Sequence, residues 1–163
     1  MVSTNDIWKA LEEVMDPEIP TISMVDLGIV THVESDPANQ SAKVILTPTF
    51  SGCPALRVME DMVRDKLHDM GIPNVDVSTN FDVTWTTDLI TEKGRKALLQ
   101  HGLAPPPEHS NGFIELEVLS NVACPHCSSL NTRLTTPFGP TLCRAMHYCD
   151  NCLQAFEQFK PVG

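Results

Sequence analysis

Residues 124–152 read CPHCSSLNTRLTTPFGPTLCRAMHYCDNC, and this stretch decides the fold of the C-terminal part of the chain. It begins and ends with a Cys-x2-Cys pair, Cys124 with Cys127 and Cys149 with Cys152. Zinc binds four thiolates tetrahedrally, and a two-residue gap lets one tight turn present two sulfurs to the same ion. The β-type residues 132–136 between the pairs are typical of a ribbon hairpin. The stretch therefore predicts a four-cysteine zinc ribbon with a structural zinc.

Two other uses of the same cysteines stay open at this point. An iron–sulfur cluster takes four thiolates as well, so the spacing alone does not choose the metal. A thioredoxin-type redox pair is less compatible, because neither pair stands in a strand–helix–strand context. Four thiolates leave no open coordination position, and we therefore expect the metal to hold the fold rather than to catalyse.

Three further residues of this stretch are candidates for metal or thiol chemistry. Cys143 lies between the pairs, where it can be buried, replace a ligand or act as an extra thiol. His126 and His147 flank the ligands, and we expect them to be solvated or to support a ligand without binding the metal.

A proline-rich segment precedes the ribbon. Residues 104–112 include three consecutive prolines, which favour an extended and semi-rigid spacer. We therefore predict a first domain over residues 1–103, a linker over 104–112 and the zinc-ribbon-like module over 113–163.

The first domain alternates helix and strand signals. The expected elements are helices at 5–17, 54–70 and 91–101 and strands at 22–33, 43–47 and 75–85. Asn5 is the expected N-cap of the first helix, Pro54 the expected first residue of the second, and Gly28 a bend in the first strand. This order predicts an α+β fold, with helices packed on a small mixed sheet.

Cys53 is the single cysteine of the first domain and stands in a strand-to-helix turn. A thiol at a helix N-terminus meets backbone N–H groups and the positive end of the helix dipole, which favours the thiolate. Such a thiolate can hold a metal or a cluster, or attack an electrophile. The alternative is a small buried residue that happens to precede a helix.

Carboxylates near the start of the chain offer oxygen ligands. Asp16 and Glu18 flank Pro17, and Asp26 follows in the next segment. They can face Cys53 and help to hold a transient metal. The alternative is that Asp16 ends the first helix while Glu18 and Asp26 are solvated.

Composition excludes several classes of function. The formal net charge is -10 and no run of Lys or Arg occurs, which argues against nucleic acid and against an acidic membrane surface as partners. No apolar run is long enough to span a bilayer, and the first residues lack the pattern of a secretory signal. We therefore expect a cytoplasmic protein, where thiols stay reduced.

The order of short motifs in the first 100 residues resembles the MIP-type iron–sulfur assembly domain. The motifs are Asp16-Pro17-Glu18-Ile19-Pro20, Asp26-Leu27-Gly28-Ile29-Val30 and Thr47-Pro48-Thr49 leading to Gly52-Cys53-Pro54. The resemblance implies that Cys53 handles iron or a cluster and that Asp16 and Glu18 belong to an acidic signature. Leu89 departs from the pattern, which has a second tryptophan after Trp85.

The tail is similar to that of the PaaD (PaaJ) family of phenylacetate catabolism. The matching residues are Cys124-Pro125-His126-Cys127, Phe138-Gly139-Pro140-Thr141-Leu142-Cys143, Cys149-Asp150-Asn151-Cys152 and Phe156-Glu157-Gln158-Phe159-Lys160. Cys143 thus falls on a family motif, whereas Pro140 replaces a small polar residue. The resemblance implies zinc at the four paired cysteines and a role beside the multicomponent phenylacetyl-CoA epoxidase.

The function expected from this resemblance is that of an accessory maturation factor without catalysis of its own. Its expected partners are components of the oxygenase or its iron–sulfur reductase, and a homodimer can share one metal between two Cys53 thiols. The rival hypothesis is an adaptor subunit that transfers no metal. A thiol–disulfide enzyme that uses Cys53 with Cys143 is a third hypothesis.

Overall fold

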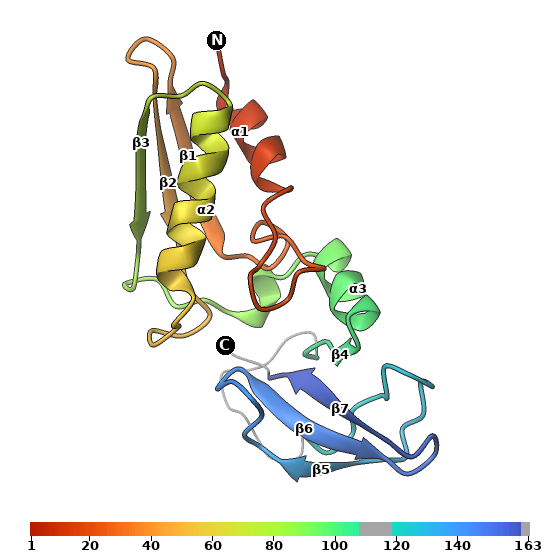
Figure 1. The fold of residues 1–163 in the computed structure, drawn as a ribbon. Helices are drawn as coiled ribbons and strands as arrows, with labels where there is room; N and C mark the ends of the chain where they lie inside the picture. Colours follow the sequence, from red (N-terminus) through yellow and green to blue (C-terminus); the bar gives the residue numbers. More distant parts are fainter. Residues whose placement is uncertain (108–118, 161–163) are drawn as a thin grey trace. The chain divides into compact units, whose positions relative to one another are not determined.

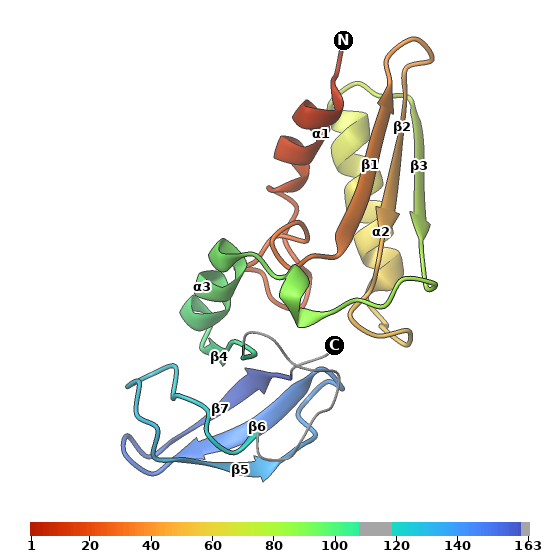
Figure 2. The ribbon, with the colours of Figure 1, turned by 180° about the vertical axis from the view of Figure 1, so that it is seen from behind.

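A parallel strand–helix–strand crossover organises the first part of the chain in the computed structural model, which describes residues 1–107 and 119–160. The elements of this part are α1 (Thr4–Leu11), β1 (Val30–Asp36), β2 (Ser41–Leu46), α2 (Leu56–Asp69) and β3 (Asn74–Thr79). The sheet order is β1-β2-β3, with β1 antiparallel and β3 parallel to β2. Both α1 and α2 pack on one face of this mixed sheet (Figures 1 and 2).

The first helix starts earlier and ends earlier than its periodicity predicts. Ser3, not Asn5, is the N-cap, because its side chain and that of Asp6 form a reciprocal capping box. The helix ends at Leu11, and the following loop makes an isolated bridge between Met15 and Ser23.

Two predicted strands are shorter in the structure. Residues 22–29 form turns and no strand, and β1 begins only at Val30. Gly28 adopts a φ of 76°, a conformation outside the strand region, which explains the late start. At the other end of the sheet, β3 ends at Thr79. The amide of Asn80 still donates to the carbonyl of Leu46 at 2.8 Å, but the alternating residues 81–85 form no strand.

The segment after β3 returns to pack on the turns at residues 26–28. The buried indole of Trp85 donates its Nε1–H to the carbonyl of Leu27 at 3.0 Å. A short helical turn, η1 (Thr87–Leu89), and the helix α3 (Glu92–Gln100) follow. Helix α3 ends before Gly102, close to the predicted end at 101.

The second part of the chain is a separate sheet. Its strands are β4 (Leu103–Ala104), β5 (Thr132–Thr136), β6 (Arg144–Cys149) and β7 (Gln154–Phe159), in the order β4-β7-β6-β5. Strands β5, β6 and β7 are antiparallel neighbours, whereas β4 runs parallel to β7. The hairpin strand predicted at 132–136 is confirmed. The fold is therefore α+β, with a small β module at the C-terminus.

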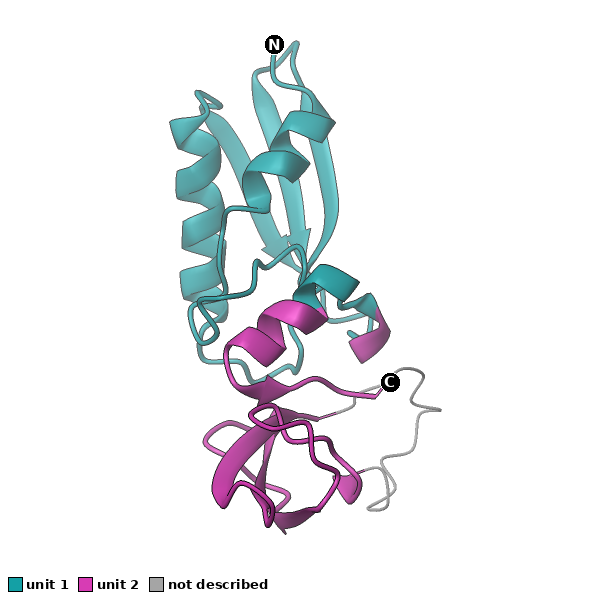
Figure 3. Ribbon diagram, turned by 90° about the vertical axis from the view of Figure 1, so that its right-hand side faces the viewer, with its two compact units in different colours: residues 1–85, 89–94 teal, residues 86–88, 95–163 magenta. Residues whose placement is uncertain are grey.

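The two compact units divide at a different position from the predicted domains (Figure 3). The first comprises residues 1–85 and 89–94, and the second comprises 86–88 and 95–163. Ala104, placed by the sequence in a linker, instead belongs to β4 and is buried in the core of the second unit. The predicted linker residues 108–112 and the first ribbon residues 113–118 lie outside the described part of the chain.

Within the residues that the structure describes, each helix is too short or too polar to cross a membrane.

Candidate functional site

The four paired cysteines come together in the second unit. Their sulfurs all lie within 4.8 Å of one another, and the structure contains no other such group of three or more metal-ligating side chains within residues 1–107 and 119–160. The Sγ atoms of Cys124 and Cys152 are 3.7 Å apart, and those of Cys127 and Cys149 are 3.6 Å apart. A tetrahedral zinc with Zn–S bonds of about 2.3 Å requires sulfurs about 3.8 Å apart. The cluster therefore fits a tetrahedral metal ion.

Each pair sits in a tight turn that the backbone closes. The amide of Ser128 donates to the carbonyl of Cys124 at 2.8 Å, and that of Leu153 donates to Cys149 at 2.9 Å. Ser128 and Leu153 both have positive φ angles, 62° and 59°. A residue in the left-handed conformation thus follows each pair. The two turns therefore have similar backbones, which explains why they present their sulfurs in the same way.

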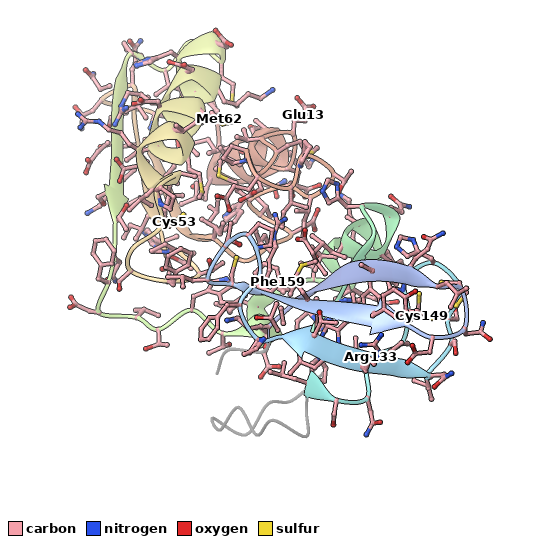
Figure 4. The ribbon with its side chains drawn as sticks, turned by 60° about the horizontal axis from the view of Figure 1, so that its bottom comes forward. Glu13, Cys53, Met62, Arg133, Cys149 and Phe159 are labelled. Atoms are coloured by element: carbon pink, nitrogen blue, oxygen red, sulfur yellow. The ribbon has the colours of Figure 1, made fainter. Side chains whose placement is uncertain are left out.

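The four sulfurs differ in their exposure. Cys124 and Cys149 are buried in an apolar cluster, and Cys152 packs against it. The cluster is completed by Ala104, Val122 and Phe156. Cys127 is exposed and does not belong to this cluster. Figure 4 labels Cys149 at the end of β6, within this unit.

Hydrogen bonds and burial shift the pKa values of the Cys127 and Cys152 thiols in opposite directions. Donation from the backbone of Ser129, followed by donation from the Asn151 side chain, lowers the pKa of the Cys127 thiol to about 6. Burial raises the pKa of the Cys152 thiol to about 12. The hydrogen bonds therefore favour the thiolate of Cys127, whereas burial favours the neutral thiol of Cys152.

Cys143 and the two histidines lie outside the four-sulfur group. The half-buried Cys143 has its Sγ 3.0 Å from the hydroxyl of Thr141, in the loop between β5 and β6. His126 is exposed, as expected. The expectation of a solvated or ligand-supporting imidazole is wrong for His147, which is completely buried, stacks on Phe156 and bonds Gln158 at 3.0 Å. This burial lowers the pKa of His147.

Cys53 stands in the turn before α2, a little farther from the helix than predicted (Figure 4). The helix begins at Leu56 with Ala55 as its N-cap, because residues 50–55 form consecutive turns. Cys53 is half-buried and lines a surface pocket of about 390 Å³. The other lining residues are Pro54, Leu56, Arg57, Glu60, Asp61 and Arg64.

Three of the charged side chains that line this pocket have polar partners. Arg64 pairs with Asp61 at 2.7 Å, and Glu60 accepts a hydrogen bond from the hydroxyl of Thr79. Arg57, one helical turn after Cys53, is exposed. The pocket thus combines a thiol with two cationic and two acidic side chains. The sequence alone does not show this combination, because the pocket forms only when α2 is in place.

Asp16 and Glu18 do not form a ligand group with Cys53 among the described residues. Asp16 is buried, and its carboxylate accepts hydrogen bonds from the backbone amides of Glu18 and Ile19, both at 2.8 Å. This carboxylate therefore shapes the loop after α1. Glu18 is half-buried and does not line the Cys53 pocket.

Asp26 is buried, so the alternative in which it is solvated is wrong. Its carboxylate accepts hydrogen bonds from the hydroxyls of Thr91 at 2.7 Å and Ser23 at 2.9 Å, and Lys93 lies 3.3 Å away. Burial acts to raise the pKa of Asp26, but hydrogen bonds from Thr91, Ser23 and Lys93 outweigh it and lower the pKa. Through these bonds Asp26 links residues 23–26 to the start of α3.

Replacing Asp26 by asparagine is expected to destabilise the first unit by about 1–3 kcal/mol at neutral pH, because Thr91 and Lys93 lose a charged acceptor. The carboxylate has a lower pKa in the folded state, so its contribution is present above about pH 4 and is lost as the pH falls through the folded pKa. Urea unfolding followed by tryptophan fluorescence should show a wild-type advantage that shrinks below pH 4. The exposed Asp82→Asn variant is the control, and a pH-independent difference would contradict this role.

Comparisons with known proteins match both parts of the chain. A family model described as an iron–sulfur cluster assembly protein matches residues 4–78. A second model, the PaaD zinc beta ribbon domain, matches residues 110–160. The second match includes all four clustered cysteines and Cys143.

Two curated relatives cover different shares of the chain. A protein of Escherichia coli (strain K12), named as one of the subunits of a "Putative 1,2-phenylacetyl-CoA epoxidase", is 36% identical over 97% of this chain and 93% of its own length. The Fe-S protein maturation auxiliary factor YitW of Bacillus subtilis (strain 168) is 31% identical over 57% of this chain and 90% of its own length. The shorter relative therefore lacks a counterpart to a large part of this chain.

Two solved structures match about the same share of this chain as the Bacillus subtilis relative does. A domain of unknown function, DUF59, from Bacillus anthracis is 27% identical with a TM-score of 0.53, over 58% of this chain and 90% of that one. A conserved hypothetical protein from Thermotoga maritima is 29% identical with a TM-score of 0.50, over 58% and 92%. The chain belongs to the PaaD family, in which a PaaD zinc ribbon follows an iron–sulfur cluster assembly domain.

Proposed function

We propose that this chain is a cytoplasmic accessory factor that helps to insert iron or an iron–sulfur cluster into the multicomponent phenylacetyl-CoA epoxidase. It acts through Cys53 and has no catalytic turnover of its own. The similarity to the Escherichia coli epoxidase protein over 97% of the chain supports the link to the epoxidase. The observation that carries the handling of iron is the half-buried Cys53 thiol in an open pocket.

We propose that the ligands that complete an iron site come from outside this pocket, because its carboxylates, Glu60 and Asp61, form no group of three metal ligands with Cys53 among the described residues. Thiolate is a ligand for iron–sulfur clusters, but one thiolate is too few for a stable site. Neither Asp16 nor Glu18 lines the Cys53 pocket, so we place the remaining ligands on the client protein or on a second copy of this chain. A site completed by ligands of the client is suited to transfer, because the iron or cluster can exchange Cys53 for client ligands without being released into solution.

We further propose that the four-cysteine cluster holds zinc and that zinc stabilises the second unit. The sulfur separations of 3.6 and 3.7 Å support a single tetrahedral ion. In this arrangement the zinc supplies no open position for substrate, and the ribbon is available to contact the epoxidase.

The test is to produce the epoxidase proteins together with this chain as wild type or Cys53→Ser. We expect the variant to lower the iron content of the epoxidase and its rate of phenylacetyl-CoA epoxidation by about tenfold or more. Ser51→Ala, an exposed change in the same turn, is the matched control. Zinc content should remain about one per chain in each variant, which separates loss of Cys53 from loss of the second unit.

The second candidate function is a structural adaptor of the epoxidase without metal transfer. It is favoured by one observation: the described residues around Cys53 do not form a group of three metal ligands. An adaptor should support full epoxidase activity with Cys53→Ser, and should still be recovered with the complex. Normal iron content together with normal activity in that variant would decide for the adaptor.

A further inference from the structure

Cys127 differs from the other three sulfurs in what surrounds it. Cys124 is 2% exposed and Cys149 is 0% exposed, whereas Cys127 is exposed to solvent and lies outside the apolar cluster. A competing ligand or an electrophile must reach a sulfur before it can displace it from a metal. Cys152 is half-buried, so Cys127 is the most exposed of the four cysteines.

The hydrogen bonds to the sulfurs differ in the same way. The Cys124 sulfur accepts a backbone N–H from His126 at 3.4 Å, and the Cys149 sulfur accepts one from Cys152 at 3.5 Å. Both donors belong to the turn that holds their own acceptor. The Cys127 sulfur likewise accepts from the backbone of Ser129 in its own turn, and in addition it accepts from the side-chain amide of Asn151 at 3.6 Å, a donor that comes from the opposite pair.

Asn151 therefore joins the two turns at their exposed end. A hydrogen bond to a thiolate draws charge from the sulfur and holds it in one direction, which lowers its reactivity and keeps it aimed at the ion. Because this donor is a side chain, a substitution can remove it without altering a backbone bond. The corresponding position of the first pair is His126, whose backbone is the donor there.

We propose that Cys127 is the exchangeable ligand of the four-cysteine site, and that Asn151 is a positioning residue that controls how readily Cys127 leaves the metal. This inference rests on metal binding by the four cysteines. It assigns an order to metal loss: Cys127 dissociates first, while the buried Cys124 and Cys149 retain the ion. Access to the site therefore passes through one sulfur.

The test uses the full-length zinc-loaded protein and two readouts. The first is limited alkylation with iodoacetamide followed by mass spectrometry, which identifies the first metal-site cysteine to react. The second is the rate of zinc transfer to a chromogenic chelator. Zinc content and the amide NMR spectrum are recorded beforehand, so that failure to bind metal is distinguished from failure of this proposal.

We expect Cys127 to be labelled before the other three cysteines of the site in the wild type. Asn151→Ala should accelerate both its labelling and zinc transfer by about tenfold, and Asn151→Asp should accelerate zinc transfer further through repulsion of the thiolate. Asn131→Ala is the matched control, an exposed asparagine near the same turns whose backbone N–H donates to the hydroxyl of Ser129. Simultaneous labelling of all four cysteines, or equal rates for Asn151→Ala and Asn131→Ala, would overturn the proposal.

Discussion

Removing the metal with a chelator, or replacing Cys149 by serine, is expected to unfold the second unit while the first unit stays folded. The apolar cluster around the site has few members, and two of them are the ligands Cys124 and Cys149. Structural zinc sites contribute about 10–16 kcal/mol of apparent binding free energy at pH 7. Whole domains have a net stability of about 5–15 kcal/mol, so the loss exceeds what this small core can replace.

The chain provides separate optical probes for the two units. Trp8 and Trp85, its two tryptophans, lie in the first unit, and its single tyrosine, Tyr148, lies in the second. Chelation should abolish the near-ultraviolet signal of Tyr148 and collapse the amide NMR dispersion of residues 119–160. The tryptophan emission should remain that of the folded protein.

Cys143→Ser is the control for this experiment, because Cys143 lies outside the four-sulfur group. This variant should keep about one zinc per chain and the Tyr148 signal. A dispersed spectrum of the second unit after complete removal of metal would contradict a metal-dependent fold. Loss of zinc from Cys143→Ser would instead assign that thiol to the site.

Gly28→Ala is expected to destabilise the first unit by about 3 kcal/mol or more. Gly28 has a φ of 76°, and a Cβ at this position would lie 2.7 Å from the carbonyl oxygen of Leu89. The left-handed conformation alone costs a non-glycine residue about 1–2 kcal/mol. The close contact adds to this cost, because it involves the backbone and cannot be relieved by turning a side chain.

Gly71→Ala separates these two contributions. Gly71 has a similar φ of 83°, but a Cβ there would meet no atom within 4 Å. Its replacement should cost only about 1–2 kcal/mol. Urea unfolding followed by tryptophan fluorescence measures both variants, and equal losses would show that the contact with Leu89 is unimportant.

The same contact gives a physical reason for the tolerance of leucine at position 89. The family pattern predicts a tryptophan here, but Leu89 lies in η1 with its Cβ and backbone against Gly28. Leu89 is 42% exposed, so this departure from the family pattern leaves the buried core around Trp85 intact. The packing depends on the backbone of Leu89 more than on its side-chain identity.

Local patterns predict the parts of the structure that are held by local interactions. The four cysteines can be grouped from their spacing alone, because a tight turn fixes the two sulfurs of each pair. Apolar periodicity predicts the helix α2, although the expected first residue is Pro54 and the observed start is Leu56. Turn bonds such as that from the Leu56 amide to the Cys53 carbonyl precede the helix and are not visible as periodicity.

Errors occur where tertiary contacts override the pattern. The alternation at residues 80–85 is typical of a strand, but β3 ends at Thr79 and Trp85 is instead buried against Leu27. The partners of the acidic residues are not visible in the sequence either: Asp16 accepts from the amides of Glu18 and Ile19, and Asp26 accepts from Thr91, while a part for Asp16 and Glu18 in iron handling stays a prediction. A carboxylate's partners depend on the folded chain, which spacing does not encode.

The strand β4 has a consequence for how such a ribbon can be inherited. Leu103 and Ala104 pair with β7, and Ala104 helps to bury the two innermost ligands. If a gene fusion transferred the ribbon from a breakpoint within Pro105–Pro107, the transferred segment would lack β4. A fusion that keeps the ribbon folded should therefore begin upstream of Leu103. We expect the ribbon and its edge strand β4 to be inherited together.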